Sequence, residues 1–342
     1  MKTIRRALLR TLPCMMLFHT AGWSQIVNGI QQGGLTNPNG YWNHHPFAMQ
    51  DYSAGGVFRI YWSCGNPNGI CVGHATSQTF FDFQPISINN SSPAVCDIQD
   101  PTVVKFNGMY YLYAAGIRAN SPGCNNPAQN FHAAIYVFGS VNGVNFWPLN
   151  AGEPVIKVSA DPSCFTCYTG KGISFPSAVV MGSGSFIRLY FHANAPGYTP
   201  VSDGILAMDT YDGVNFSNQR VIIDSTQLAG GAWAPHVRRA GASDFPLVMT
   251  YASGYGTMVA TSSSFSDTSW TLGNGGMAVS FNPTAGYSAT LVGDQTGLLL
   301  NTAGGAFTSP VSGQLAFWWA NDFIAGSRIY MGTSNAAQYF SF

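Results

Sequence analysis

The feature that most constrains the fold of this chain is a motif that recurs along most of its length. Its clearest copy, residues 96–113, places Asp100 before Pro101 at the start of an apolar strand, followed by an Asn-Gly turn at 107–108 and the aromatic strand 109–113. Asn-Gly supplies the positive φ angles of a tight hairpin between alternating apolar residues. Because a residue before proline avoids the helical region, we expect Asp100 to have an extended backbone.

Four further copies of this motif accompany the clearest one. Prolines at 46, 101, 176 and 235 open four copies, and Ser288 stands in register in the fifth, so successive copies lie 53 to 75 residues apart. Repeats of this period, each with several short strands and turn signals, are typical of a β-propeller. The paired strand segments are 45–51 with 57–63, 100–106 with 109–113, 175–180 with 186–192, 234–238 with 245–251, and 287–292 with 297–300.

A second repeat marks the outer half of two copies. Gly-Val-Asn-Phe occurs at 143–146 and at 213–216, shortly after the apolar runs 133–138 and 204–208. We expect it to close a hairpin between the third and fourth strands, and no segment has the periodicity of a long amphipathic helix. The sequence therefore predicts an all-β fold: a five-bladed β-propeller with four-stranded antiparallel blades around a central channel, forming one domain over residues 25–342.

The first 24 residues predict export. Basic residues at 2, 5, 6 and 10 precede the short apolar run 12–21, which is the pattern of a secretory signal peptide. No later stretch reaches the roughly 20 apolar residues of a membrane span. Without the leader the chain carries about four net negative charges, so a basic nucleic-acid footprint is absent. We predict a secreted or periplasmic monomer with no membrane span and no nucleic-acid partner.

Six cysteines follow the predicted leader. An even number of cysteines in an exported chain favours disulfides over metal thiolates, and no second Cys-x-x-Cys completes a zinc site. On the propeller scheme all six fall in loops at one end of the channel. Of the fifteen pairings that six cysteines allow, we favour Cys64–Cys71, Cys96–Cys124 and Cys164–Cys167.

The repeated motifs resemble those of a known group of enzymes. The Asp-Pro strand opening at 100–101 and the sequence Trp-Ala-Pro-His at 233–236 are similar to strand openings of the five-bladed propeller glycosidases, above all glycoside hydrolase family 43 and its relatives. The resemblance covers nearly the whole chain after residue 24. It implies the propeller fold and cleavage of glycosidic bonds, which usually needs one carboxyl group to protonate the leaving oxygen and another to activate water or attack.

The resemblance implies three active-site carboxylates, of which the chain keeps one. Asp100 matches the carboxylate of the second blade, whereas His45 stands at the first-blade position and Ser174 at the position of the family's glutamate. The only glutamate, Glu153, lies in a segment typical of an outer strand. We therefore predict a non-standard acid/base set, in which histidine can titrate near neutral pH. The candidate catalytic residues are Asp100, Asp97, His45 and Asp203, with Asp161 as a further candidate acid.

Aromatic and polar residues near the starts of the predicted strands are the expected sugar contacts. The predicted substrate-binding residues are His44, Ser174, Phe175, Trp233, His236, Arg238 and Tyr287. Converging histidines could also hold a metal ion. We favour substrate bonding and predict no cofactor or metal ligand, although the resembled family sometimes carries a central calcium or other divalent ion.

Two functions stay open at this point. The first is a secreted glycoside hydrolase that degrades a polysaccharide or oligosaccharide, with arabinofuranosyl or xylosyl chains as candidate substrates. The alternative is a non-catalytic glycan-binding or surface-interaction propeller, because two of the three implied carboxylates are missing. A second carboxyl group about 5–10 Å from Asp100 would favour hydrolysis.

Overall fold

The residues that the structure, a computed structural model, describes form mainly antiparallel β-sheets. The structure describes residues 44–51, 57–63, 70–75, 83–87, 95–118, 134–157, 172–182, 184–193, 204–223, 231–239, 247–253, 256–262, 270–272, 288–291, 293–294, 297–298, 314–320 and 329–335. Among these residues the only helical element is the single 3-10 turn η4 (Asn150–Gly152). The prediction of an all-β fold is confirmed.

Most strands belong to four antiparallel sheets in which sequence neighbours pair. The first sheet holds β1 (His44–Asp51), β2 (Val57–Ser63), β3 (Ile70–Ala75) and β4 (Phe83–Ser87). The second holds β5 (Val95–Phe106), β6 (Met109–Arg118), β7 (Ala134–Ser140), β8 (Trp147–Pro148) and β9 (Ile156–Lys157), which pairs with β7. The third holds β10 (Ile173–Met181), β11 (Phe186–Ala193), β12 (Gly204–Thr210) and β13 (Phe216–Ile223).

The C-terminal part of the chain continues this pattern in the fourth sheet only. The predicted pairing of 287–292 with 297–300 was wrong, because residues 288–291 pair with 317–320 and residues 297–298 pair with 293–294. The fourth sheet holds β14 (Trp233–Arg239), β15 (Leu247–Ser253), β16 (Gly256–Ser262) and β17 (Thr271–Leu272). A three-stranded sheet follows with the order β18 (Ser288–Leu291), β21 (Gln314–Ala320) and β22 (Ile329–Asn335). A two-stranded ribbon pairs β19 (Gly293–Asp294) with β20 (Gly297–Leu298).

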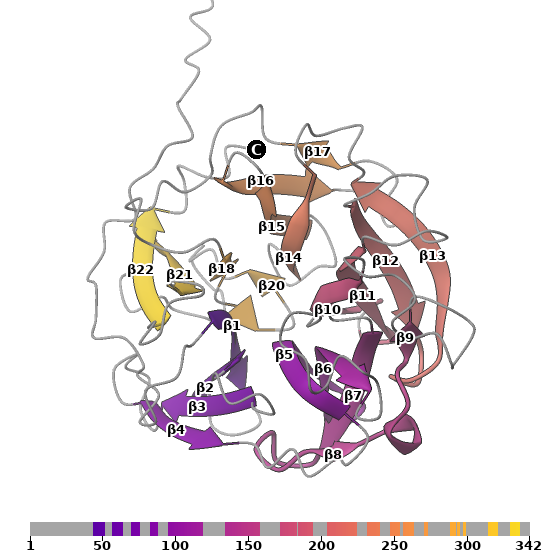
Figure 1. Cartoon of the computed structure of the whole chain (residues 1–342). Coiled ribbons are helices and arrows are strands. Elements are labelled where there is room, and N and C mark those ends of the chain that lie inside the picture. Colours follow the sequence, from indigo (N-terminus) through magenta and orange to yellow (C-terminus); the bar gives the residue numbers. More distant parts are fainter. Residues whose placement is uncertain are drawn as a thin grey trace, which may run out of the picture.

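The first strands of these sheets surround a common centre. Strand β1 contacts β5, β5 contacts β10, β10 contacts β14, β14 contacts β18, and β18 contacts β1. Figure 1 shows these strands nearest the centre and β4, β8, β13, β17 and β22 at the rim. The sheets therefore stand face to face around a ring, and each sheet has to bury both of its faces.

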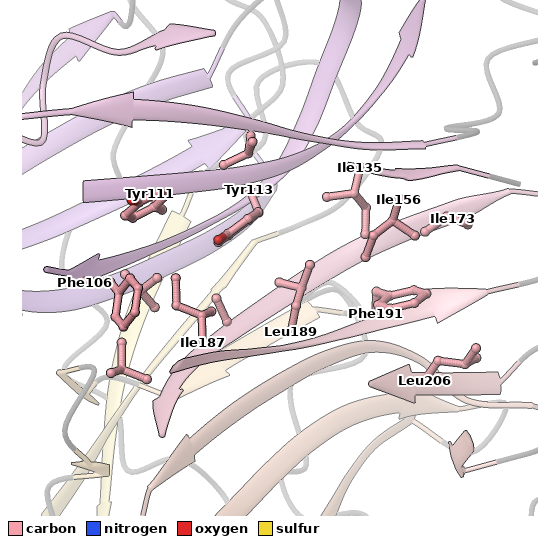
Figure 2. Packing of buried hydrophobic residues seen from close by; sticks show 14 of the residues in the cluster. Phe106, Tyr111, Tyr113, Ile135, Ile156, Ile173, Ile187, Leu189, Phe191 and Leu206 are labelled. Carbon is pink, nitrogen blue, oxygen red and sulfur yellow. The ribbon is translucent and has the colours of Figure 1, made fainter. Parts of the chain in front are cut away.

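Alternation along the second sheet shows how both faces are buried. Val103 and Leu112 belong to a core cluster shared with the first sheet, whereas their chain neighbours Val104 and Tyr111 belong to one shared with the third. Successive side chains of a strand point to opposite faces, so an apolar run in sequence fills two interfaces. Figure 2 shows the cluster between the second and third sheets, with Phe106 and Tyr113 facing Ile187 and Leu189.

The Gly-Val-Asn-Phe repeats form the predicted hairpin turns, between β7 and β8 and between β12 and β13. The Ser140 and Thr210 hydroxyls each accept the N–H of the glycine three residues later, at 2.9 Å. Each turn is also fastened to the preceding sheet. Tyr61 donates to the Gly143 carbonyl at 2.8 Å, and Tyr113 donates to the Gly213 carbonyl at 2.9 Å. The repeat therefore encodes both a turn and a contact between sheets.

Candidate functional site

Each of the first four sheets carries the same irregularity near the start of its inner strand. In β5 Gln99 pairs with Ala115 and Thr102 with Tyr113, so residues 100 and 101 stand opposite one residue of β6. The same one-residue bulge lies between residues 44 and 47, 174 and 177, and 233 and 236. In every case the second residue of the bulge is the repeated proline. The proline motif thus encodes a bulge, a device that re-aims side chains at the end of a strand.

The residue before the proline has a left-handed backbone in three of these bulges. Its φ angle is 54° at Asp100, 51° at Phe175 and 50° at Ala234. The sequence-based expectation that Asp100 is extended was therefore wrong. The bulge requires an extra residue in this conformation, and its requirement outweighs the preference of a residue before proline. Positive φ is uncommon for aspartate and a clear outlier for a bulky residue such as Phe175, and backbone strain of this kind concentrates at functional sites.

Two hydrogen bonds hold these bulges at one level in neighbouring sheets. The Ala178 N–H donates to Thr102 Oγ1 at 3.1 Å, and the Val237 N–H donates to Ser177 Oγ at 2.8 Å. In both pairs the acceptor directly follows the proline and the donor stands two residues after the next proline. The bulges of β5, β10 and β14 therefore lie side by side at the end of the ring where the inner strands begin, which we name the start face.

Asp100 is the only carboxylate among the described side chains of the inner strands, and it is 3% exposed. Both of its carboxylate oxygens are shielded from solvent. Burying a carboxylate costs free energy. The equivalent bulges of the third and fourth sheets hold the apolar residues Phe175 and Ala234, so the bulge itself does not require a carboxylate. A buried acid in a strained backbone is therefore a functional-site candidate.

The third sheet brings a hydroxyl and an imidazole together on the same face. Ser174 Oγ lies 3.1 Å from His192 Nδ1, and both side chains are partly exposed. The Phe175 ring lies 6.1 Å from the His192 ring between centroids. Trp233, also partly exposed, takes the register position of Ser174 in the fourth sheet. His192 was not among the predicted site residues. The pairing of strands 175–180 and 186–192 was predicted, but the bulge sets the register that makes His192 the partner of Ser174.

His236 and Arg238 are buried in β14. His236 occupies the position of Thr102 and Ser177, directly after the proline, and is 7% exposed. The Arg238 side chain is 2% exposed; its guanidinium donates to the Val237 carbonyl at 2.8 Å and lies 4.0 Å from the Phe47 ring centroid. This contact joins the fourth sheet to the first. The structure thus places Arg238 in packing between sheets.

Several predicted site residues lie beyond the side chains that the structure describes. His44, His45 and Asp97 lie on β1 and β5, and only their backbone is described. Register places His45 at the same bulge position as Asp100. Asp203, Tyr287 and Asp161 lie outside the described part of the chain, and each proposed disulfide has at least one cysteine outside it.

The part of the chain that the structure describes has neither a cluster of metal-ligating side chains nor a membrane-spanning helix. It contains no group of three or more histidine, cysteine, aspartate or glutamate side chains able to hold a metal ion. It also contains no helix of the length and apolar character needed to span a bilayer. Glu153 is exposed beside η4, between the outer strands β8 and β9 of the second sheet.

Comparison with known proteins identifies solved structures that share this architecture. No protein-family model and no curated protein sequence matches the chain. Solved structures do match. The GH43_1 enzyme from Xanthomonas citri, complexed with xylotriose, has a TM-score of 0.60 at 14% identity, covering 90% of this chain and 92% of that one. A GH62 hydrolase in complex with xylotriose has a TM-score of 0.60 at 12% identity, covering 93% and 99%.

An α-L-arabinofuranosidase from Lactobacillus brevis matches in the same way, with a TM-score of 0.58 at 9% identity over 87% of this chain and 92% of that one. The predicted resemblance to family 43 and its relatives is therefore confirmed at the level of the fold. At these identities the likeness concerns the fold alone.

Proposed function

We propose that this chain is a secreted glycoside hydrolase that acts on a polysaccharide or oligosaccharide, with Asp100 in its active site. The observation that carries the proposal is a buried carboxylate held at a left-handed bulge on the start face of this fold. The solved structures that share the fold include hydrolases complexed with xylotriose and an arabinofuranosidase. Xylosyl and arabinofuranosyl chains are therefore the first substrates to test.

The proposed molecule is a monomeric five-bladed propeller over residues 25–342, with a signal peptide before it and disulfides in the loops of the start face. The closed sequence of contacts among β1, β5, β10, β14 and β18 supports five blades, the fifth being built on β18, β21 and β22. The stacked bulges support a binding site at the channel mouth, because they aim residues from neighbouring sheets at one end of the ring.

The proposed chemistry needs an acid and a base beside Asp100. Asp100 would orient the sugar and stabilise positive charge that develops at the anomeric carbon, since a carboxylate shielded from water acts strongly on a nearby charge. His45 would stand at the same bulge position one sheet away, and Asp97 and Asp203 are the remaining candidate acids. Trp233, Phe175 and Tyr287 would stack on sugar rings.

Release of reducing sugar from a panel of arabinans and xylans tests this proposal. The mature protein should cleave at least one polysaccharide, and Asp100→Asn should lower the rate by about 100-fold or more, as loss of an active-site charge does. Asp212→Asn is the matched control, because Asp212 lies in a turn whose equivalent residue is already Asn142. Equal rates for wild type and Asp100→Asn would contradict the role of Asp100.

A glycan-binding propeller without hydrolytic activity is the second candidate. One observation favours it: the bulges that are equivalent to Asp100 in the third and fourth sheets hold Phe175 and Ala234, neither of which can transfer a proton. Affinity electrophoresis in gels that contain the same polysaccharides separates the two functions. Retardation without any sugar release would favour binding, whereas release that depends on Asp100 would favour hydrolysis.

A further inference from the structure

The pair formed by Ser174 and His192 is the side-chain arrangement on the start face with the clearest chemical capacity. Ser174 begins the third inner strand, one residue before the strained Phe175, and its hydroxyl lies 3.1 Å from His192 Nδ1. A hydroxyl within hydrogen-bond distance of an imidazole is the geometry from which a proton can pass in either direction. Both side chains are partly exposed, so a bound molecule could reach them.

A hydroxyl paired with an imidazole is not a constant feature of the repeated motif. The register-equivalent pairs are His44 with Ser63 in the first sheet, where only the backbone is described, Gln99 with Ala115 in the second and Trp233 with Ala252 in the fourth. The pairs of the second and fourth sheets, which flank the third, cannot transfer a proton at neutral pH. The repeat therefore does not require a hydroxyl and an imidazole here, and the third sheet has them in addition to the common bulge.

The pair also begins on the strand next to the one that carries Asp100. Strand β10 packs against β5, and the bond between the Ala178 N–H and Thr102 Oγ1 fixes the two strands at one level. Asp100 stands two residues before Thr102, and Ser174 stands four residues before Ala178, both toward the start face. A carboxylate and a proton-transfer pair on adjacent strands are the two kinds of group that glycosidic cleavage needs.

We propose that Ser174 and His192 form a proton relay that supplies the general acid of glycoside cleavage, an inference that rests on the proposed function. Protonated His192 gives the proton on Nδ1 to Ser174 Oγ while the Ser174 hydroxyl gives its own proton to the glycosidic oxygen. The bond between the anomeric carbon and that oxygen breaks, and the leaving sugar departs as an alcohol. Water adds to the anomeric carbon and loses a proton to the basic group of the site, and solvent returns a proton to His192.

In this relay Ser174 contacts the substrate, whereas His192 acts through Ser174. General acid catalysis accelerates reactions by about 10²–10⁴-fold and matters most when the leaving group is a poor one. A sugar hydroxyl is a poor leaving group, whereas 2,4-dinitrophenolate leaves without protonation. Dependence on the leaving group therefore distinguishes proton donation from a structural role, which would affect both substrates alike.

The experiment compares kcat/KM on two substrates of the same sugar: the polysaccharide that the wild type cleaves and the 2,4-dinitrophenyl glycoside. For Ser174→Ala and His192→Gln we expect a loss of about 10²–10⁴-fold on the polysaccharide and less than about tenfold on the aryl glycoside. Ser174→Thr keeps the hydroxyl and should restore most of the activity. Ser185→Ala is the matched control, because Ser185 is exposed in the turn of the same hairpin and bonds only within that turn, to the Gly182 carbonyl at 2.6 Å.

Equal losses on both substrates, or no loss on either, would overturn the relay while leaving the hydrolase intact. Circular dichroism and urea midpoints of each variant identify a loss that comes from misfolding, and His192→Asn then provides a second test of the same imidazole. If the wild type cleaves neither substrate, the proposed function is wrong and the relay with it. The two failures are thus distinguishable.

Discussion

Replacing Gly213 by alanine tests how the sheets are held together. Gly213 lies in the turn between β12 and β13, at φ 84°, against the second sheet. A Cβ atom there would lie 2.6 Å from Cδ1 of Tyr111 and closer still to Cε1. The Tyr111 ring cannot simply move, because it is 7% exposed and lies between Phe106 and Tyr113, with ring centroids 6.1 and 6.5 Å away.

Gly108 provides a matched control for this substitution. Its φ angle is 82°, nearly that of Gly213, but no atom lies within 4 Å of the position that a Cβ would occupy. Gly108→Ala should therefore cost only the left-handed strain, about 1–2 kcal/mol. Gly213→Ala should cost that strain and about 1–3 kcal/mol more from overpacking between the sheets.

Urea unfolding at 25 °C, followed by tryptophan fluorescence, measures both losses of stability. We expect a clearly lower midpoint for Gly213→Ala than for Gly108→Ala, with equal slopes. Equal midpoints would refute the reasoning, because they would mean that the turn does not pack tightly on Tyr111. A double variant, Gly213→Ala with Tyr111→Ala, should recover part of the difference if the contact is direct.

Three other substitutions probe buried polar groups. Tyr113→Phe should cost about 1–2 kcal/mol in urea unfolding, because it removes a 2.9 Å bond to a turn carbonyl of the next sheet. Tyr251→Phe should be neutral or slightly stabilising, because within the described part of the chain its buried hydroxyl has no partner and burial raises its pKa to about 12. Burial alone would raise the pKa of Asp209, but hydrogen bonds and charge from Arg188 and Arg220 outweigh it and lower the pKa below its usual 3.8. Asp209 therefore stabilises the fold above that pH and loses this contribution as pH falls through the lowered pKa. The difference in urea midpoint between wild type and Asp209→Asn should be widest above pH 5 and shrink below pH 3.8; a constant difference would contradict this account.

Much of the fold follows from local sequence signals. The prolines at 101, 176 and 235 mark the inner strands, and Gly-Val-Asn-Phe marks the outer turns, because glycine provides the positive φ and the close approach that these turns need. The sequence did not show that the prolines sit in bulges. Local preference favours an extended residue before proline, and only the pairing with the second strand requires the left-handed residue seen at Asp100.

The candidate site was predictable only in part. Asp100 stands out in the sequence because it lies in the repeat, and its burial agrees with a special role. The pairing of Ser174 with His192 depends on register across a hairpin, which a one-residue bulge shifts. The Arg238 guanidinium packs on Phe47 from another sheet, a contact between segments far apart in sequence that no local pattern could predict.

A crystal structure of Asp100→Asn with an arabino- or xylo-oligosaccharide bound would test the central claim most directly. The substitution should slow cleavage enough for the intact sugar to be seen. We predict a sugar on the start face, with its scissile bond near residue 100 and within reach of Ser174, and a ring stacked on Trp233 or Phe175. A sugar bound only at the rim of the sheets, with the start face empty at saturating ligand, would contradict an active site built around Asp100.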